Sequence, residues 1–451
     1  MLEKDQKYTI EITDLGHEGE GIGRLEGVAV FVPGTVPLDV AEVTIKELKK
    51  SFAFGKLEKI VEPSKYRVEP SCQYANTCGG CPMMPIAYDA QLKMKKKMVV
   101  DSLERIGKII DPEVKNTMGM KTPFGYRNKA QFPISSTGIG FYKVKSHDVV
   151  DCDQCIIQTQ AADQAKDVLR KYILSDKVSS YDEKTEEGLL RHLVVKTAFG
   201  TGEVMVILVM NGRKLPNRDK LIDMMVKGVP NLKSLVVNVN TRKTSQIMGK
   251  ECITIFGKDK IIEKMEGLSF EISPLSFYQV NPVQMKRLYN MVIEYGQLNG
   301  TQTVFDLYSG VGSIGLYCAK KALKVIGIES EKDAYLDAVR NAIINNIVNA
   351  EFIHGKTEIE LPKLLEKGEK PDVVILDPPR SGCHELLLAS VAEMAPARIV
   401  YVSCNPATLA RDIKILCASG YEFVEAQPVD MFPNTMHVEC VVNLERRLKL
   451  V

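Results

Sequence analysis

Hydrophobic and polar positions change their rhythm twice along the 451 residues, which divides the chain into three parts. The first part, residues 1–60, holds short alternating runs between turns that are rich in glycine and proline. The runs are KYTIEITDL, GVAVFVPG and AEVTIKEL. This spacing predicts a small OB-like β-barrel, a fold that often binds RNA.

The second part, residues 61–275, predicts a central α+β domain that also binds RNA. A cysteine-rich stretch comes first, and a helix is expected over about 87–107. From residue 124 onward the pattern is mainly that of strands. The two longest apolar runs, at 189–210 and 232–243, are separated by one helical segment.

The third part, residues 276–451, begins with a well-defined helix. Asn281 suits its N-cap and Pro282 its first turn. One helical face then carries four apolar side chains, which are Met285, Leu288, Val292 and Tyr295. Beyond residue 300 apolar strands, turns and helices alternate, which predicts an α/β fold with a doubly wound, Rossmann-like parallel sheet.

Composition is ordinary for a globular protein, with 45% hydrophobic and 26% charged residues. No apolar run approaches the roughly 18 residues of a transmembrane helix. The opening MLEKDQKYTI has neither the basic nor the apolar region of a signal peptide. We therefore expect a cytoplasmic protein that does not contact a membrane, and a monomer, since nothing indicates an obligatory protein partner.

The net charge of +2, from 59 basic and 57 acidic residues, does not by itself indicate a partner. Three stretches, 46–56, 93–98 and 126–132, concentrate basic residues, most of them with aromatic neighbours. Such stretches suit phosphate contacts and base stacking in RNA. For 93–98 a solvated helix face explains the pattern equally well.

A glycine-rich turn follows the first strand of the third part. FDLYSGVGSIGL (305–316) passes through three glycines into a helix, and these let a nucleotide-like ligand approach the backbone. Glu329, at the end of the next strand, is placed to bind ribose hydroxyls. NAD or a turn without function would fit the same glycines.

The start of this motif distinguishes the cofactors. Asp306, followed by a hydrophobic residue, an aromatic residue and Ser-Gly-x-Gly, resembles motif I of S-adenosylmethionine-dependent methyltransferases. ILDPPR (375–380) follows in the expected order, which favours a methyltransferase over a dehydrogenase. Relatives that methylate amino groups carry an aromatic residue after Pro-Pro, whereas this chain has Arg380, so an exocyclic amine is a less suitable target.

Methylation of a pyrimidine ring carbon requires a nucleophile, because C5 alone is too weak to attack a methyl donor. A thiolate that adds at C6 activates C5, and a base later removes the C5 proton. Cys404 follows the apolar run RIVYV and precedes Asn405-Pro406, which predicts a thiol at the carboxyl end of the sheet. Packing is the ordinary role of a free cysteine, but the turn, a helix start near Thr408 and the nearby Arg411 all favour a thiolate.

Two residues before and within the last apolar strand can serve as the base. They are His437 and Glu439, and a structural role at the surface is the alternative for both. The residues alone do not decide between them.

Four blocks together closely resemble the RNA uracil-5-methyltransferases. These are DLYSGVGSIGL, LDPPRSG, VSCNPATLARD and DMFPNTMHVECV, and SPLSFYQVNP (273–282) resembles the start of that family's methyltransferase domain. The resemblance implies Cys404 as the nucleophile and Glu439, rather than His437, as the base. It implies Phe277 in the uracil pocket and four residues at the S-adenosylmethionine site, which are Gln279, Tyr308, Glu329 and Asp377.

The resemblance also bears on the cysteine-rich stretch, where Cys72, Cys78 and Cys81 are spaced C-x5-C-x2-C. Zinc sites normally use two close pairs, so this spacing suits an iron–sulfur cluster better. Similar family members hold a four-iron [4Fe-4S] cluster with Cys155 as the fourth ligand, although Cys152 lies close enough to compete. Zinc or an empty, reduced site are the alternatives.

The barrel resembles a TRAM module, which in this family accompanies ribosomal RNA enzymes more than transfer RNA enzymes. The resemblance therefore implies 23S ribosomal RNA as the substrate, methylated at one uridine or two. A transfer RNA methyltransferase would share the chemistry. A redox-sensing RNA-binding protein without enzymatic activity would explain the barrel and the cysteines, but not the ordered acidic residues and Cys404.

Overall fold

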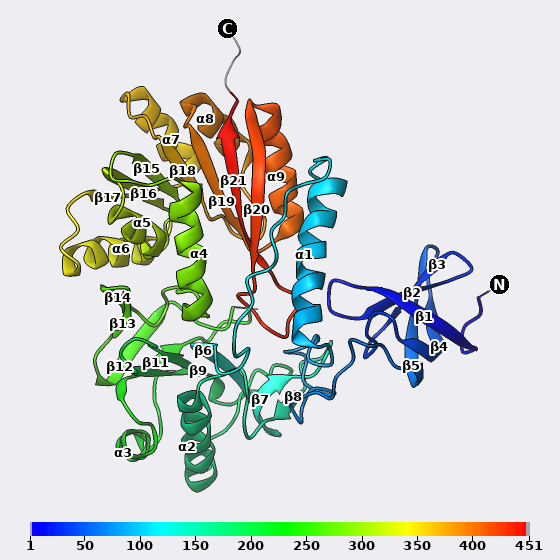
Figure 1. Cartoon of the computed structure of the whole chain (residues 1–451). Coiled ribbons are helices and arrows are strands. Elements are labelled where there is room, and N and C mark those ends of the chain that lie inside the picture. The colour runs from blue at the N-terminus through cyan, green and yellow to red at the C-terminus, as the bar shows by residue number, and fades with distance from the viewer. Residues whose placement is uncertain (1, 245, 448–451) are drawn as a thin grey trace.

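The computed structural model describes residues 2–244 and 246–447 and has three parts (Figure 1). The first is a closed barrel of five strands in the order β1-β2-β3-β5-β4. The strands are β1 (Lys7–Leu15), β2 (Gly21–Leu25), β3 (Val28–Val32), β4 (Val40–Leu48) and β5 (Phe52–Glu62). Alternate residues such as Ile10, Ile12, Val43 and Ile45 fill the interior. The predicted small barrel is confirmed.

The central part is a sheet in the order β12-β11-β10-β9-β6-β7-β8. Its strands are β6 (Lys129–Ser135), β7 (Gly138–Tyr142), β8 (Val149–Asp151), β9 (Leu190–Thr197), β10 (Val204–Met210), β11 (Leu232–Val239) and β12 (Glu251–Gly257). The expected helix between β10 and β11 is α3 (Arg218–Gly228). A second helix, α2 (Gln160–Asp176), was not expected. Both pack against the same core of the sheet.

The C-terminal part is the predicted α/β unit, with strand order β17-β16-β15-β18-β19-β21-β20. The strands are β15 (Thr303–Leu307), β16 (Lys324–Glu329), β17 (Ala350–His354), β18 (Val373–Leu376), β19 (Arg398–Ser403), β20 (Tyr421–Val429) and β21 (Glu439–Arg446). The helices are α4 (Pro282–Tyr295), α5 (Ser313–Ala319), α6 (Lys332–Ile344), α7 (Thr357–Glu366), α8 (Glu385–Met394) and α9 (Pro406–Ala418). The first five strands in this order are parallel, whereas β21 runs antiparallel to both of its neighbours.

Helix α4 begins as its sequence predicts. The Asn281 side chain accepts a hydrogen bond from the backbone N–H of Gln284, and Pro282 lies in the first turn. The predicted apolar face is buried. It joins a core shared with the hairpin of β13 (Ile261–Met265) and β14 (Leu268–Ile272), which links the central and C-terminal parts.

Helix α1 (Tyr88–Arg105) confirms the helix expected near 87–107. Its Val99 and Leu103 are fully buried in the core of the C-terminal part, and the helix packs against α9 and β20 (Figure 1). The barrel is tied to the rest of the chain by ion pairs from Asp14 to Lys97 and from Glu18 to Lys145, at 3.1 and 3.0 Å. Among the described residues, we find no helix with the length and apolarity needed to cross a membrane.

Candidate active site

The predicted catalytic residues meet at the carboxyl edge of the C-terminal sheet. Asp377 directly follows β18, and Cys404 directly follows β19. Because β21 runs antiparallel to β19 and pairs Ser403 with Cys440, its first residue, Glu439, lies at the same edge. Side chains from three strands therefore converge where ligands bind in α/β folds.

The glycine turn after β15 adopts a conformation that only glycine takes easily. Gly310 and Gly312 have φ of 56° and 77°. A side chain at Gly312 would meet the Phe352 ring at 2.8 Å. The turn is tied to the next strand, because the Gly310 N–H donates to the Glu329 carboxylate at 2.8 Å. A ligand can therefore approach this backbone closely.

Two buried polar atoms beside this turn have no hydrogen-bond partner, namely Asp306 Oδ1 and Ser309 Oγ. The other Asp306 oxygen accepts from the Gly315 N–H at 2.8 Å. Burial, and then the charge of Asp377, raise the pKa of Asp306 to about 8. Unpaired buried acceptors are costly, so this turn fits a ligand that brings a cationic donor, as the ammonium group of S-adenosylmethionine would.

A cleft of about 380 Å³ opens next to the turn. Its lining includes Tyr308, Ser330, Thr357 and Pro379. The cleft therefore adjoins Glu329 and Asp377, which lie one and two residues before Ser330 and Pro379. Tyr308 itself has a positive φ of 67°, an uncommon strain for an aromatic residue. Three of the four predicted cofactor residues thus belong to this edge of the sheet.

The fourth predicted cofactor residue, Gln279, lies in the loop that precedes α4 rather than in the lining of the cleft. Its side chain is 9% exposed, and its carbonyl accepts a hydrogen bond from Asn128 Nδ2 at 2.9 Å. In the same loop the Phe277 side chain is 65% exposed. An exposed aromatic ring suits contact with a base but is not part of the core.

Cys404 is half-buried in the turn before α9. Burial, and then the charge of Glu439, raise its pKa to about 11, while Arg380 acts in the opposite direction. The expectation that Arg411 favours the thiolate is wrong, because that side chain is bound to Asp412 and to the Ser381 carbonyl, at 2.8 and 3.0 Å. In the free protein the thiol is therefore protonated at neutral pH.

Glu439 is only 5% exposed. Burial, and then the charge of Asp377, raise its pKa to about 8, and burial raises the pKa of Asp377 to about 7. Buried carboxyl groups with such values titrate near neutral pH, which suits proton transfer. His437, the other candidate base, contacts the Phe432 ring edge-on, and burial followed by Arg380 lowers its pKa to about 4.

Two features of the site were not found from the sequence. The cation next to Cys404 is Arg380, which the sequence analysis considered only for the type of target. The other is Lys95 on α1, which is fully buried and forms an ion pair with Asp430 in the loop before Glu439. Its spacing from Gln91 and Val99, four residues on either side, is the signal that could have placed it on the buried face.

The predicted cysteine ligands come from two segments that lie side by side. The backbone of Cys78 forms an isolated antiparallel β-bridge with Lys143, and the Asp153 N–H donates to the Tyr74 hydroxyl at 3.0 Å. The pKa of Cys81 is raised by burial first and then by three thiols, those of Cys155, Cys78 and Cys72. All four predicted thiols are therefore neighbours.

The competing thiol, that of Cys152, is 3% exposed and donates to the Gln154 carbonyl at 3.1 Å. Within 2–244 and 246–447, no group of three or more His, Cys, Asp or Glu side chains is already spaced as metal ligands. The donor set of four neighbouring thiols fits a cluster in its chemistry.

Comparison with protein families gives two matches. Residues 87–447 match the family tRNA (Uracil-5-)-methyltransferase, and residues 3–57 match the TRAM domain. The chain is 48% identical over 98% of its length to a protein of Caldanaerobacter subterraneus subsp. tengcongensis, of which it covers 98%. A protein of Clostridium tetani is 45% identical over 98% of the chain and 96% of its own length. Both are named as uncharacterized RNA methyltransferases.

Among solved structures, the chain resembles the Pyrococcus abyssi tRNA (uracil-54, C5)-methyltransferase in complex with S-adenosyl-L-homocysteine. The TM-score is 0.78 at 32% sequence identity, and the match covers 97% of this chain and all of that one. The likeness therefore extends over the barrel, the central part and the C-terminal sheet together.

Proposed function

Because the chain belongs to the tRNA (uracil-5-)-methyltransferase family, we propose that it methylates C5 of uridine in 23S ribosomal RNA, at one or two sites, through a covalent adduct of Cys404. Membership makes it an RNA methyltransferase that depends on S-adenosylmethionine. The observation that supports the proposed adduct is that one thiol, Cys404, and one buried carboxyl group, Glu439, lie together at one edge of the sheet.

The residues of this chain divide the reaction between them. The Cys404 sulfur, once deprotonated, forms a bond to C6, and the C5–C6 π electrons move toward C5 and O4. C5 takes up the methyl group of S-adenosylmethionine, whose S–CH3 bond breaks to leave S-adenosylhomocysteine. The Glu439 carboxylate then removes the C5 proton, the C5–C6 double bond forms again, and the C6–S bond breaks to return the thiolate.

The cofactor residues in this proposal are Gln279, Tyr308, Glu329 and Asp377. Glu329 holds the ribose hydroxyls, since one carboxylate oxygen accepts from the Glu331 N–H and the Ser330 hydroxyl, whereas the other accepts only from the Gly310 N–H and keeps an acceptor position. Tyr308 lines the adjoining cleft. Asp377 lies between this cleft and Cys404, whose pKa it helps to raise. Gln279 approaches from the loop before α4.

Ribosomal RNA is the proposed substrate because the chain combines a barrel with a set of four neighbouring cysteines. Transfer RNA is the second candidate. It is favoured by the match to the P. abyssi enzyme, which is named as a tRNA methyltransferase. That match leaves only 3% of this chain uncovered, so the barrel alone does not separate the two substrates.

Transfer of tritiated methyl groups from S-adenosylmethionine tests the choice of RNA. We expect the purified protein to label 23S ribosomal RNA from a strain that lacks its gene, and to leave RNA from the parent strain unlabelled because its site is already methylated. Unmodified transfer RNA is the comparison substrate, and labelling of transfer RNA alone would replace the first candidate by the second. Mapping 5-methyluridine in the labelled RNA counts the sites.

The proposal includes a [4Fe-4S] cluster held by Cys72, Cys78, Cys81 and Cys155. Cys155 is preferred to Cys152 because, after burial, its charge is the main cause of the raised pKa of Cys81, whereas the Cys152 thiol donates to the Gln154 carbonyl. Such a cluster would hold the loop 72–81 against the segment that follows β8. It takes no part in the methyl transfer, which involves no change of oxidation state.

Metal analysis of protein purified without oxygen tests the cluster. We expect about four iron atoms and four sulfide ions per chain, and their loss in Cys81→Ser. Cys252→Ser is the matched control, because this half-buried thiol accepts a hydrogen bond from Asn238 Nδ2 instead of facing the other cysteines. A stoichiometric amount of zinc in place of iron would contradict the proposal.

A further inference from the structure

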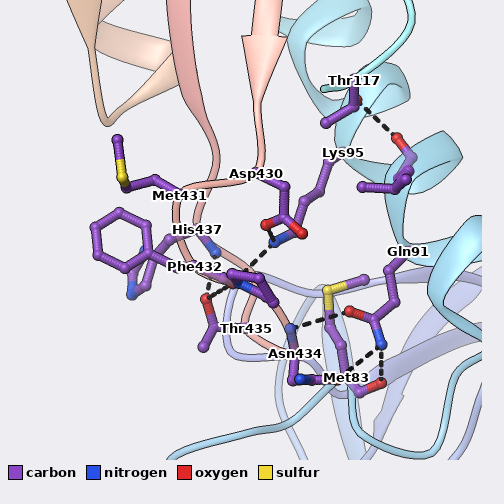
Figure 2. Close-up of polar contacts among 12 residues, drawn as sticks. Met83, Gln91, Lys95, Thr117, Asp430, Met431, Phe432, Asn434, Thr435 and His437 are labelled. Carbon is purple, nitrogen blue, oxygen red and sulfur yellow. Dashed lines mark hydrogen bonds and ion pairs between the residues drawn. The ribbon is translucent and has the colours of Figure 1, made fainter. Parts of the chain in front are cut away.

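Glu439 is preceded by a nine-residue loop that joins β20 to β21. We call residues 430–438 the hairpin loop, and the pairing of Val429 with Glu439 closes it. In Figure 1 this loop reaches from the C-terminal sheet toward the foot of α1 and the central part. Figure 2 shows that α1 and the segment before it contact the loop through side chains. Its conformation is therefore set partly by residues distant in sequence.

The first contact is a completely buried ion pair. Lys95 Nζ lies 2.5 Å from Asp430 Oδ1, and neither side chain is exposed (Figure 2). The same ammonium group donates to the Phe432 carbonyl at 3.0 Å. The other Asp430 oxygen accepts from the Tyr88 hydroxyl at 2.7 Å. Two residues of α1 thus fix the start of the hairpin loop.

The second contact lies one turn earlier on α1 and fixes the middle of the loop. Gln91 Nε2 donates to Asn434 Oδ1, and Gln91 Oε1 accepts from the Asn434 N–H, both at 3.1 Å (Figure 2). The Met83 N–H donates to the Asn434 carbonyl at 3.1 Å, and the Met83 carbonyl accepts from Gln91. The Asn434 amide group also donates to the Pro123 carbonyl at 3.2 Å, so the backbone and the side chain of Asn434 are both held by segments distant in sequence.

The nucleophile is held by different contacts. Asn405 Nδ2 and the Thr408 hydroxyl both donate to the Arg380 carbonyl, at 3.1 and 3.2 Å. None of these groups belongs to α1 or to the hairpin loop. A disturbance of the loop is therefore transmitted to Glu439 and His437 before it reaches Cys404.

Burial of a complete charge pair stabilises a protein weakly, because desolvation offsets the attraction between the charges. In several proteins such a pair instead fixes one geometry of the segments that it joins. We propose that Lys95 and Gln91 are positioning residues for proton abstraction, which hold the hairpin loop so that Glu439 points at C5 of the covalently bound uracil. This proposal rests on the proposed function above.

The role predicts a separation of two rates that are normally linked. The C5 proton leaves only after the methyl group has been added, so a misplaced Glu439 slows proton release and leaves methyl transfer intact. A structural defect instead lowers both rates together. The covalent, methylated complex would accumulate in the first case only.

The test uses RNA that carries tritium at C5 of uridine, together with methyl-labelled S-adenosylmethionine. Lys95→Met/Asp430→Asn removes both charges without leaving one unpaired. We expect methyl transfer in a single turnover to stay within about twofold of the unmodified protein, and tritium release to slow by roughly 10- to 100-fold, as expected for a displacement of about 1 Å. The methylated adduct should persist on denaturing gels.

Lys220→Met/Asp176→Asn is the matched control, since it removes an ion pair of 2.7 Å between α3 and α2 with one nearly buried partner. It should leave both rates unchanged. Gln91→Met, which removes no charge, provides a second variant if the double variant does not fold, and it should shift the same ratio in the same direction. Equal loss of both rates, or no change in either variant, would overturn the positioning role. Absence of an adduct between the unmodified protein and RNA that contains 5-fluorouridine would instead count against the proposed function.

Discussion

Cys404→Ala is expected to lower methyl transfer to RNA by about 10⁴-fold or more, the effect of removing a nucleophile that no neighbouring group can replace. C5 of uracil does not attack a methyl donor unless C6 carries an electron-donating substituent. The closest other acidic groups, Asp377 and Glu439, are carboxyl groups with raised pKa values rather than thiols. The measurement is methyl transfer under single-turnover conditions, with the amount of folded protein determined by circular dichroism.

The same variant should lose the covalent trap. RNA that contains 5-fluorouridine forms an adduct that cannot release the C5 substituent, so the unmodified protein should give a shifted band on denaturing gels, and Cys404→Ala should not. Cys417→Ala is the control, because this half-buried thiol lies on α9 away from the sheet edge. Unchanged turnover in Cys404→Ala would disprove the proposed mechanism.

Glu439→Gln is expected to leave the adduct and slow its release. Removal of a general base typically costs 10²- to 10⁴-fold in the step that it serves, and that step here is loss of the C5 proton. Because bond formation between Cys404 and C6 precedes it, the methylated complex should accumulate with ordinary uridine RNA. A chase with unlabelled S-adenosylmethionine from a preformed complex measures the release rate.

The pH dependence of release gives a second measurement on the same residue. The pKa of Glu439 is raised to about 8, and only the carboxylate can accept the proton. Release by the unmodified protein should therefore rise with pH up to about 8, by roughly tenfold per pH unit below that value, and then level off. Release by Glu439→Gln should not follow this profile. A profile shared by both proteins would assign the titration to another group.

Local sequence patterns were sufficient for most of the architecture. Asn281 and Pro282 mark the start of α4 because capping depends on neighbours within one turn. The glycine turn and Asp306 gave the cofactor edge for a similar reason, since strand, turn and helix follow one another in sequence. The position of Cys404 after β19 also follows from adjacent residues. Helix α2 was missed although its apolar spacing is local.

Contacts between distant segments could not be found in this way. The run 93–98 reads as a basic patch or a solvated face, yet Lys95 within it is completely buried against Asp430. Because Asp430 is 335 residues away, no pattern near Lys95 could indicate this contact. The charges around Cys404 also come from a segment distant in sequence. Arg411 lies on α9, the helix that follows Cys404, but its side chain is hydrogen-bonded to Asp412. The cation that lowers the pKa of the thiol is Arg380, from the turn after β18.

The span of the Lys95–Asp430 contact bears on how the chain is made. At the usual 5 to 20 residues per second, a ribosome needs roughly 20 to 70 seconds to synthesise the 335 residues that separate the two partners. Until then Lys95 and the inner face of α1 have no hairpin loop to pack against. The order of synthesis therefore delays assembly of the hairpin loop and Glu439 until the last two strands have emerged.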